Sequence, residues 1–178
     1  MKKGILYVNQ FFGQIGGEEM ADAKPQIKEG CIGPAMELNK QLGEDVEITH
    51  TIICGDNYMG SNQDEALEEI MVFLKDKEMD IFFAGPAFRA GRYGFACGSV
   101  CKEVKKQFNV PVLTSMDVEN PGVEMYKADL IIFKGGASAA AMRSDIKAMA
   151  DYAKKIINNE ELLSADEEGY FTRGKRSQ

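Results

Sequence analysis

Amides, aromatics, glycines and carboxylates crowd the stretch NQFFGQIGGEE (residues 9–19), which directly follows an apolar run. The stretch contains no lysine, serine or threonine, the residues that usually accompany the glycines of a phosphate-binding loop. Its GQIGG segment also lacks the G-x-G-x-x-G spacing of a dinucleotide-binding turn. We therefore do not expect a phosphate-cradling loop of the Walker or flavodoxin type. The aromatic content predicts an ordered binding or interface loop instead.

Four further stretches of the same character follow apolar runs, namely CGDNYMGSN, AGPAFRAGRYGFACG, SMDVENPG and KGGASAAAMR. The connections that precede the apolar runs, such as QLGEDVE and KDKEMD, are ordinary charged turns. In a parallel sheet the ends of the strands meet at one edge, and ligands bind beyond the carboxyl ends. This asymmetry predicts that one edge of the sheet carries a site.

The residue types at this edge suit a small zwitterion. Carboxylates and aromatic faces bind an ammonium group through ion pairing and cation–π contact. Arg89 and Arg92 offer forked donors for a carboxylate of the same ligand. No residue is assigned a catalytic role. The candidate substrate-binding or interface residues are Asn9, Gln10, Phe11, Phe12, Gly16, Gly17, Glu18, Glu19, Asp56, Asn57, Tyr58, Pro86, Arg89, Arg92, Tyr93, Glu119, Asn120 and Arg143.

Several of these residues also have a purely structural interpretation. Phe11 and Phe12 are typical of core or lid packing, and Glu18 and Glu19 are typical of a solvated loop face. The stretch GGASAAAMR is either a helix start of small residues packed on the sheet or an anion site at a helix N-terminus. His50 lies within an apolar strand pattern, which favours a structural histidine over a catalytic one.

The elements that position these residues alternate between strand and helix. Apolar runs predict strands at 4–8, 46–54, 80–88, 110–116 and 129–133. Helices are predicted at 33–43, 61–78, 99–109 with a start near Arg92, 121–128 as a single turn, and 138–159. We expect one doubly wound α/β domain over 1–160, flavodoxin/Rossmann-like, with a mainly parallel five-stranded sheet in the order 2-1-3-4-5.

Composition excludes several classes of protein. The chain has 178 residues and a net charge of -7 without a basic patch, so nucleic acid is not an expected partner. No apolar stretch reaches the roughly 20 residues that span a bilayer, and the N-terminus lacks a signal-peptide pattern, so we expect a cytoplasmic protein. Four cysteines form no CxxC and no common zinc spacing, which predicts reduced thiols and no metal site.

NQFFGQIGGEE, ICGDNY, AGPAFRAGRYGFACG, VENPGVEMY and AAAMR together resemble one family. They are similar to the N-terminal half of the selenoprotein B subunit of the glycine/sarcosine/betaine reductase complexes. The resemblance runs from about residue 7 to about residue 173. Family members continue into a C-terminal half that carries a selenocysteine within a cysteine-containing redox motif, and this sequence contains no such motif. Residues 161–178 are then a tail or a linker to that half, and the chain is a domain, a split subunit or a shortened relative.

The resemblance implies reductive deamination of a small amine by a multi-subunit complex. A pyruvoyl group on a partner subunit of component B and a selenocysteine elsewhere in the complex would supply the reactive groups, so no cofactor is expected in this chain. Selenoprotein A would receive the two-carbon fragment. This chain would be a non-redox domain of component B that contributes scaffold, subunit interface and part of the small-amine site. The alternative is a stand-alone small-amine binding or regulatory module without catalysis.

Overall fold

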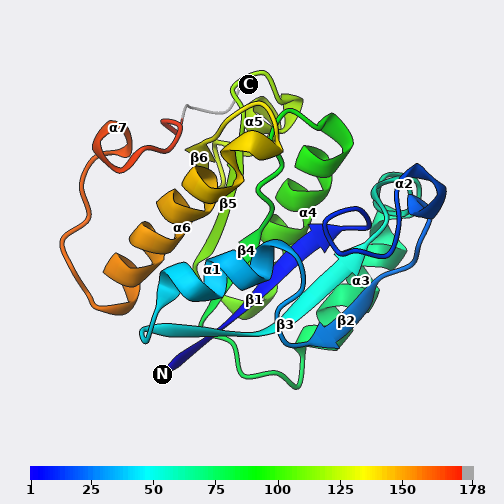
Figure 1. Cartoon of the computed structure of the whole chain (residues 1–178), viewed down its shortest axis with the longest axis horizontal. Coiled ribbons are helices and arrows are strands. Elements are labelled where there is room, and N and C mark those ends of the chain that lie inside the picture. The colour runs from blue at the N-terminus through cyan, green and yellow to red at the C-terminus, as the bar shows by residue number, and fades with distance from the viewer. Residues whose placement is uncertain (174–178) are drawn as a thin grey trace.

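The computed structural model describes residues 1–173, which fold into a sheet with helices on both faces (Figure 1). None of the helices in these residues combines the length and the apolar character needed to cross a membrane. The elements in chain order are β1 (Lys2–Asn9), η1 (Glu18–Met20), β2 (Gln26–Glu29), α1 (Pro34–Leu42), β3 (Val46–Cys54), α2 (Asp56–Ser61), α3 (Gln63–Leu74), β4 (Ile81–Ala84), α4 (Gly91–Phe108), β5 (Val112–Met116), α5 (Pro121–Tyr126), β6 (Ile131–Lys134), η2 (Ala139–Ala141), α6 (Met142–Ile157) and α7 (Ala165–Glu168).

The sheet has six strands in the order β2-β3-β1-β4-β5-β6. The five strands β3, β1, β4, β5 and β6 are parallel and reproduce the predicted order 2-1-3-4-5. The doubly wound α/β fold is therefore confirmed. The predicted strand count is wrong by one, because β2 adds an antiparallel edge strand against β3.

The edge strand β2 escaped the sequence pattern because it is short and polar. Its sequence QIKE contains one large apolar residue, Ile27, and its burial falls from half-buried to exposed along the strand. The strand pairs through its backbone, from Gln26 opposite Ile53 to Glu29 opposite His50. Charged residues on an edge strand are a common protection against unwanted pairing with other chains.

The predicted helices exist, but several boundaries differ. The helix expected over 61–78 is α3, which begins at Gln63 and ends at Leu74. A further short helix, α2, precedes it, and Asn62 separates the two with φ -131° and ψ 46°. The strand expected over 80–88 ends at Ala84, where Gly85 adopts φ +89° and precedes a cis peptide bond to Pro86. The helix expected over 138–159 begins as the 3-10 turn η2 and continues as α6.

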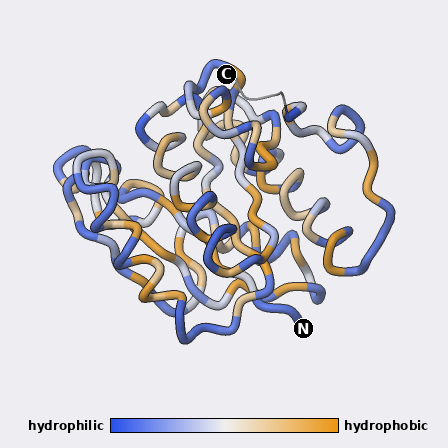
Figure 2. Tube along the Cα trace, turned by 180° about the vertical axis from the view of Figure 1, so that it is seen from behind, coloured by the Kyte–Doolittle hydropathy of each residue, from blue (hydrophilic) through white to orange (hydrophobic). Residues whose placement is uncertain are grey.

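Two apolar cores fill the space between the sheet and its helices. Along β1, Ile5 and Tyr7 point into the core that α2, α3, α4 and α5 cover. Leu6 and Val8 point into the core under α1 and α6. Figure 1 shows α1 and α6 together in front of the sheet, and Figure 2 shows hydrophobic segments along the strands and hydrophilic ones in the connections.

The segment after α6 returns to the sheet. Tyr170 forms a bridge with Phe133 of β6, and the Phe171 backbone N–H donates to the Ile132 carbonyl over 2.9 Å. The rings of Phe133, Tyr152 and Tyr170 lie 5.5–5.8 Å apart in edge-to-face pairs. The predicted tail therefore contains a docked part at 165–171. Residues 174–178 of that tail lie outside the described residues.

Candidate functional site

Two buried amides join the end of β1 to the start of α2. Asn9 Nδ2 donates to Asp56 Oδ2 over 3.0 Å, and the Asp56 backbone N–H donates to Gln10 Oε1 over 3.1 Å. Asn9 Oδ1 also accepts from the Phe12 backbone N–H over 2.9 Å, which orders the loop that follows β1. The amides of NQFFGQIGGEE thus hold two strand ends in place at the carboxyl edge of the sheet.

Asp56 is the most buried carboxylate in this part of the edge. Only 6% of the residue is exposed, and burial raises the pKa of its carboxyl group, opposed by the hydrogen bond from Asn9. Among residues 1–173 its Oδ1 atom has no hydrogen-bond partner and no contact with solvent. A buried carboxylate oxygen without a partner is costly, and a cationic ligand group would stabilise it.

Arg92 lies beside this carboxylate at the start of α4. Its Nη2 atom donates to Glu18 Oε2 over 2.8 Å, and its Nη1 atom donates to Asn57 Oδ1. The side chains of Arg92 and Glu18 are 51% and 70% exposed, so water competes with this ion pair. The pKa of Glu18 is lowered by the hydrogen bond from Arg92. Arg92 can therefore exchange Glu18 for another carboxylate at little cost.

A cleft of about 380 Å³ opens between α2 and the start of α4. The walls carry one buried carboxylate, one guanidinium and one aromatic ring, and two glycines leave room between them. This size and chemistry suit a small zwitterion, with the ammonium group toward Asp56 and the carboxylate toward Arg92. The lining residues are Asp56, Asn57, Gly60, Ser61, Gly91, Arg92 and Phe95.

Aromatic side chains fill the space under the loop. Phe12 stacks on Tyr93 at 5.7 Å between ring centroids and packs against Phe88 at the same distance. Phe11 points outward and is 62% exposed. The hydroxyls of Tyr7 and Tyr93 are buried, and burial raises the pKa of both well above the usual value.

A second polar group lies at the ends of β4 and β5. Arg89 Nε donates to Asp117 Oδ1 over 2.9 Å, and this hydrogen bond lowers the pKa of Asp117. The Asn120 side chain donates to the carbonyls of Phe88 and Ala90 over 3.0 and 3.1 Å. It also accepts from the Gly122 backbone N–H over 3.0 Å, which caps α5. Asn120 thus connects the segment between β4 and α4 to the start of α5.

The structure does not bring every predicted residue into these two groups. Arg143 is exposed on α6, and its Nε atom lies 3.9 Å from Glu37 of α1 on the opposite face of the sheet. Tyr58 is packed into the core. Gly16, Gly17 and Glu19 shape the loop, where the Gly17 N–H donates to the Glu19 carboxylate over 2.9 Å. Pro86 is buried behind β4, and Glu119 is exposed beside Asp117.

Sequence reasoning missed three residues of this edge. Asp117 directly follows the apolar residues of β5, so the rule that selected Asp56 would also have selected it. Asp145 accepts from the Gly136 backbone N–H over 3.2 and 3.1 Å, and burial raises the pKa of its carboxyl. No local pattern marks Asp145, which lies within a helix. Phe95 lines the cleft through its place one turn after Gly91 on α4.

All four cysteines are free thiols. Cys54, Cys97 and Cys101 are buried, and Cys31 is half-buried. Burial raises the pKa of each thiol, to about 12 for Cys54. Cys97 and Cys101 share the inner face of α4, as their spacing predicts. Thiols of this kind are poor nucleophiles. No group of histidine, cysteine or carboxylate side chains in residues 1–173 is arranged to hold a metal ion.

Comparison with known proteins gives one consistent result. Residues 1–178 match the family described as glycine/sarcosine/betaine reductase selenoprotein B. The chain is 62% identical over 178 residues to the betaine reductase complex component B subunit beta of Peptoclostridium acidaminophilum. It is 45% identical over 175 residues to the sarcosine reductase complex component B subunit beta of the same organism. It is 47% identical over 172 residues to the glycine reductase complex component B subunit gamma of Carboxydothermus hydrogenoformans. The chain spans 40% of the length of each of these relatives, and 97–100% of the chain is aligned.

Proposed function

This chain belongs to the glycine/sarcosine/betaine reductase selenoprotein B family, and we propose that it acts as a non-redox domain of component B in such a reductase. The observation that carries the proposal is the 62% identity over all 178 residues to a betaine reductase component B subunit. In this role the domain supplies scaffold, subunit interface and a binding site for the amine that undergoes reductive deamination.

The amine site of this proposal is the cleft between α2 and α4. The largely buried carboxylate of Asp56, which lines the cleft, attracts an ammonium group through its negative charge, and Phe95 offers an apolar wall for its substituents. The Arg92 guanidinium offers a fork for the carboxylate of the same molecule, in exchange for its exposed pair with Glu18. Burial of Asp56 favours a ligand that brings its own positive charge.

Betaine is the amine we propose among the three. Identity to the betaine reductase subunit is 62%, against 45% and 47% for the sarcosine and glycine reductase subunits. A quaternary ammonium group cannot donate a hydrogen bond, so its binding depends on charge and on contact with aromatic faces. Phe95 is the aromatic residue that lines the cleft and can supply such a face.

We propose that the redox chemistry takes place outside residues 1–173. The raised pKa values of the four thiols make each of them a weak nucleophile in this fold. We propose that the selenocysteine and the pyruvoyl group belong to other parts of the complex, and that the partners of this chain are a pyruvoyl-containing component B subunit and selenoprotein A. The chain's own residues bind and orient the amine.

Calorimetry with glycine, sarcosine and betaine tests the site. We expect betaine to bind more tightly than the other two amines, and Asp56→Asn to weaken betaine binding about tenfold or more. Asp166→Asn, which changes an exposed carboxylate on α7, is the matched control and should leave binding unchanged. Absence of heat with all three amines would reject the cleft as the amine site.

The alternative is a stand-alone small-amine binding or regulatory module, in which the cleft between α2 and α4 would bind the amine without any redox group. Gel filtration of the chain with a purified pyruvoyl-containing component B subunit separates the two functions. Co-elution, together with amine binding, supports the reductase domain. Amine binding without any association with that subunit supports the stand-alone module.

A further inference from the structure

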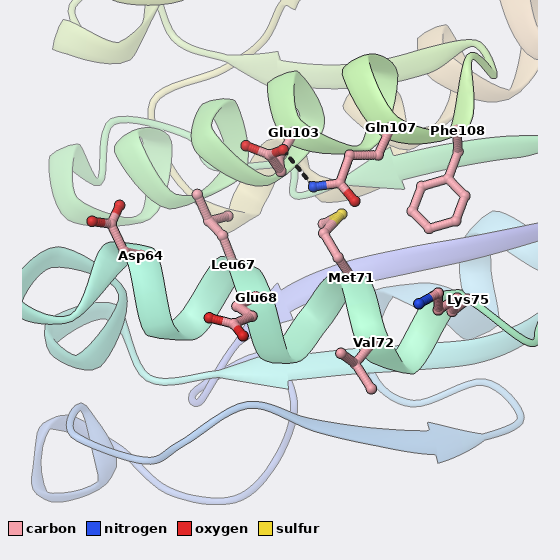
Figure 3. A pocket seen from close by; sticks show the side chains of 9 residues that line it. All are labelled: Asp64, Leu67, Glu68, Met71, Val72, Lys75, Glu103, Gln107 and Phe108. Carbon is pink, nitrogen blue, oxygen red and sulfur yellow. Dashed lines mark hydrogen bonds between the residues drawn. The ribbon is translucent and has the colours of Figure 1, made fainter.

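A groove of about 450 Å³ runs between α3 and α4 (Figure 3), and it shares no lining residue with the amine cleft. Leu67 and Met71 rise from α3 toward α4, and the ring of Phe108 descends from the last residue of α4 (Figure 3). Residues 67 and 71 are one helical turn apart and share a face. The floor of the groove is therefore apolar, although it opens to solvent.

The apolar surface continues over the edge of the groove. Val72 is 62% exposed and belongs both to this groove and to a neighbouring hollow of about 460 Å³. Phe73 lines the neighbouring hollow. Continuous apolar surface of this kind on a soluble domain marks a place where another molecule binds.

Negative charge surrounds this apolar surface. Five carboxylates line the two hollows: Asp64, Glu65, Glu68, Glu69 and Glu103. None of them forms an ion pair among residues 1–173. Lys75 is the one cation that lines either hollow within the described residues. Asp64 and Glu68, like Glu65 and Glu69, stand four residues apart on α3. Like charges at this spacing destabilise a helix by roughly 0.2–0.5 kcal/mol per pair.

We propose that this groove binds a cationic amphipathic helix of a partner polypeptide. The apolar face of such a helix would cover Leu67, Met71, Val72 and Phe108, and its lysines or arginines would pair with the surrounding carboxylates. α3 has 12 residues and is about 18 Å long, which matches roughly three turns of a bound helix. The acidic rim disfavours an anionic lipid surface or a nucleic acid as the occupant.

Fluorescence anisotropy with three labelled synthetic peptides tests this proposal on the full 178-residue chain. The probe is a peptide of about 14 residues, built from leucine, lysine and alanine, with leucines on one helical face and lysines on both flanks. The second peptide has the same composition with the leucines distributed around the helix, and the third has glutamate in place of lysine. We expect the first peptide to bind about tenfold or more tightly than the other two, and its binding to weaken as salt rises.

Two variants and their controls locate the binding. Val72→Glu should weaken the first peptide about tenfold, and the double variant Glu68→Gln/Glu103→Gln should weaken it several-fold and reduce its salt dependence. Val118→Glu changes a valine that is 67% exposed at the carboxyl edge, and Glu161→Gln changes an exposed carboxylate elsewhere. Both controls should bind as the unchanged protein does. Circular dichroism confirms that each exposed substitution leaves the fold intact.

Three outcomes would overturn the proposal. Equal binding of all three peptides would show that the surface has no preference for a cationic amphipathic helix. Unchanged binding by Val72→Glu at high salt, where the attraction between the added carboxylate and the peptide lysines is screened, would place the peptide elsewhere. Self-association of the protein that Val72→Glu abolishes, without peptide binding, would identify a second copy of this chain as the occupant.

Discussion

Asn9 Nδ2 lies 3.0 Å from Asp56 Oδ2, in a buried contact that joins residues 47 positions apart in the chain. Each strand end is thereby fixed relative to the other, and one oxygen of the carboxylate is occupied while Oδ1 has no partner in the part of the chain that the structure describes. The burial of this carboxylate therefore lowers the free energy of unfolding of the domain. A ligand cation near Asp56 would stabilise the carboxylate.

Asp56→Asn should make the protein more stable at neutral pH. Burial raises the pKa of Asp56 in the folded state, so the folded state binds the proton more tightly than the unfolded state does. Its favourable contribution is therefore complete at acid pH and is lost as pH rises through the raised folded-state pKa. Other carboxylates, such as Asp117, have lowered pKa values and contribute with the opposite sign, so the two proteins must be compared. In urea unfolding between about pH 3 and pH 8, the free energy of unfolding of Asp56→Asn should rise relative to that of the unchanged protein as pH increases.

The same variant should bind betaine more weakly, so stability and binding change in opposite directions. A loss of stability at neutral pH in Asp56→Asn would contradict the raised pKa. The control Asp166→Asn should change neither the pH dependence of unfolding nor betaine binding.

Asn120→Ala should destabilise the domain by about 3 kcal/mol, because three hydrogen bonds are lost at once. Asn120→Asp keeps the acceptor for the Gly122 N–H and faces the carbonyls of Phe88 and Ala90 with a negative charge. We expect this second variant to regain stability as pH falls and the new carboxyl is protonated. Urea unfolding at two pH values measures both effects, and equal stability of the two variants at all pH values would contradict the assignment.

Gly98→Ala should destabilise the protein by about 1–3 kcal/mol. A Cβ atom at this position would lie 2.1 Å from the ring of Tyr126, whose hydroxyl is fixed by a 2.8 Å contact with Ser99 Oγ. Gly60→Ala is the matched control, because no atom lies within 4 Å of a Cβ there. Gly60 is within α2, where alanine should stabilise by about 0.5–1 kcal/mol. The melting temperature should therefore fall in Gly98→Ala and rise in Gly60→Ala.

Cys31 should react with a disulfide reagent faster than the other three thiols in the folded protein, because it is more accessible, although burial raises its pKa as well. Cys54, Cys97 and Cys101 are buried, and burial raises their pKa values. Cys31 is half-buried at the surface, near the Ile48 carbonyl. Titration of the folded protein should count one fast thiol, and titration in denaturant should count four. Cys31→Ser should remove the fast thiol of the folded protein. Rapid reaction of more than one thiol would contradict the burial of the others.

The sequence predicts the parallel sheet and its strand order well, because apolar strand segments alternate regularly with helical segments along the chain. It does not predict β2. This strand is held by backbone pairing with β3, which does not require a particular pattern of side chains. The sequence also does not predict α2, whose six residues DNYMGS include a glycine and have no helical apolar pattern. The backbone N–H groups of Asn57 and Tyr58 donate to the Ala21 carbonyl and hold α2 against the segment that follows β1.

The location of the site at the carboxyl edge follows from the rule for parallel sheets, but the role of each residue there does not. The Asn9 side chain bonds to Asp56 and to a backbone N–H, and the Asn120 side chain bonds to backbone groups. Arg89 and Arg92 pair with carboxylates 28 and 74 positions away. Contacts between residues so distant in sequence depend on the folded arrangement, and one sequence holds no direct record of them.

Glu18→Gln should tighten amine binding several-fold, because Glu18 competes with the ligand carboxylate for Arg92 in the proposed site. The Arg92 side chain is exposed, and its pair with Glu18 over 2.8 Å is open to exchange. Arg92→Met should weaken binding about tenfold or more by removing the fork for that carboxylate. Calorimetry with betaine at low salt measures both changes, and Glu161→Gln is the control for a simple change of net charge. If Glu18→Gln weakens binding as Arg92→Met does, Glu18 holds Arg92 in its binding position and does not compete with the ligand.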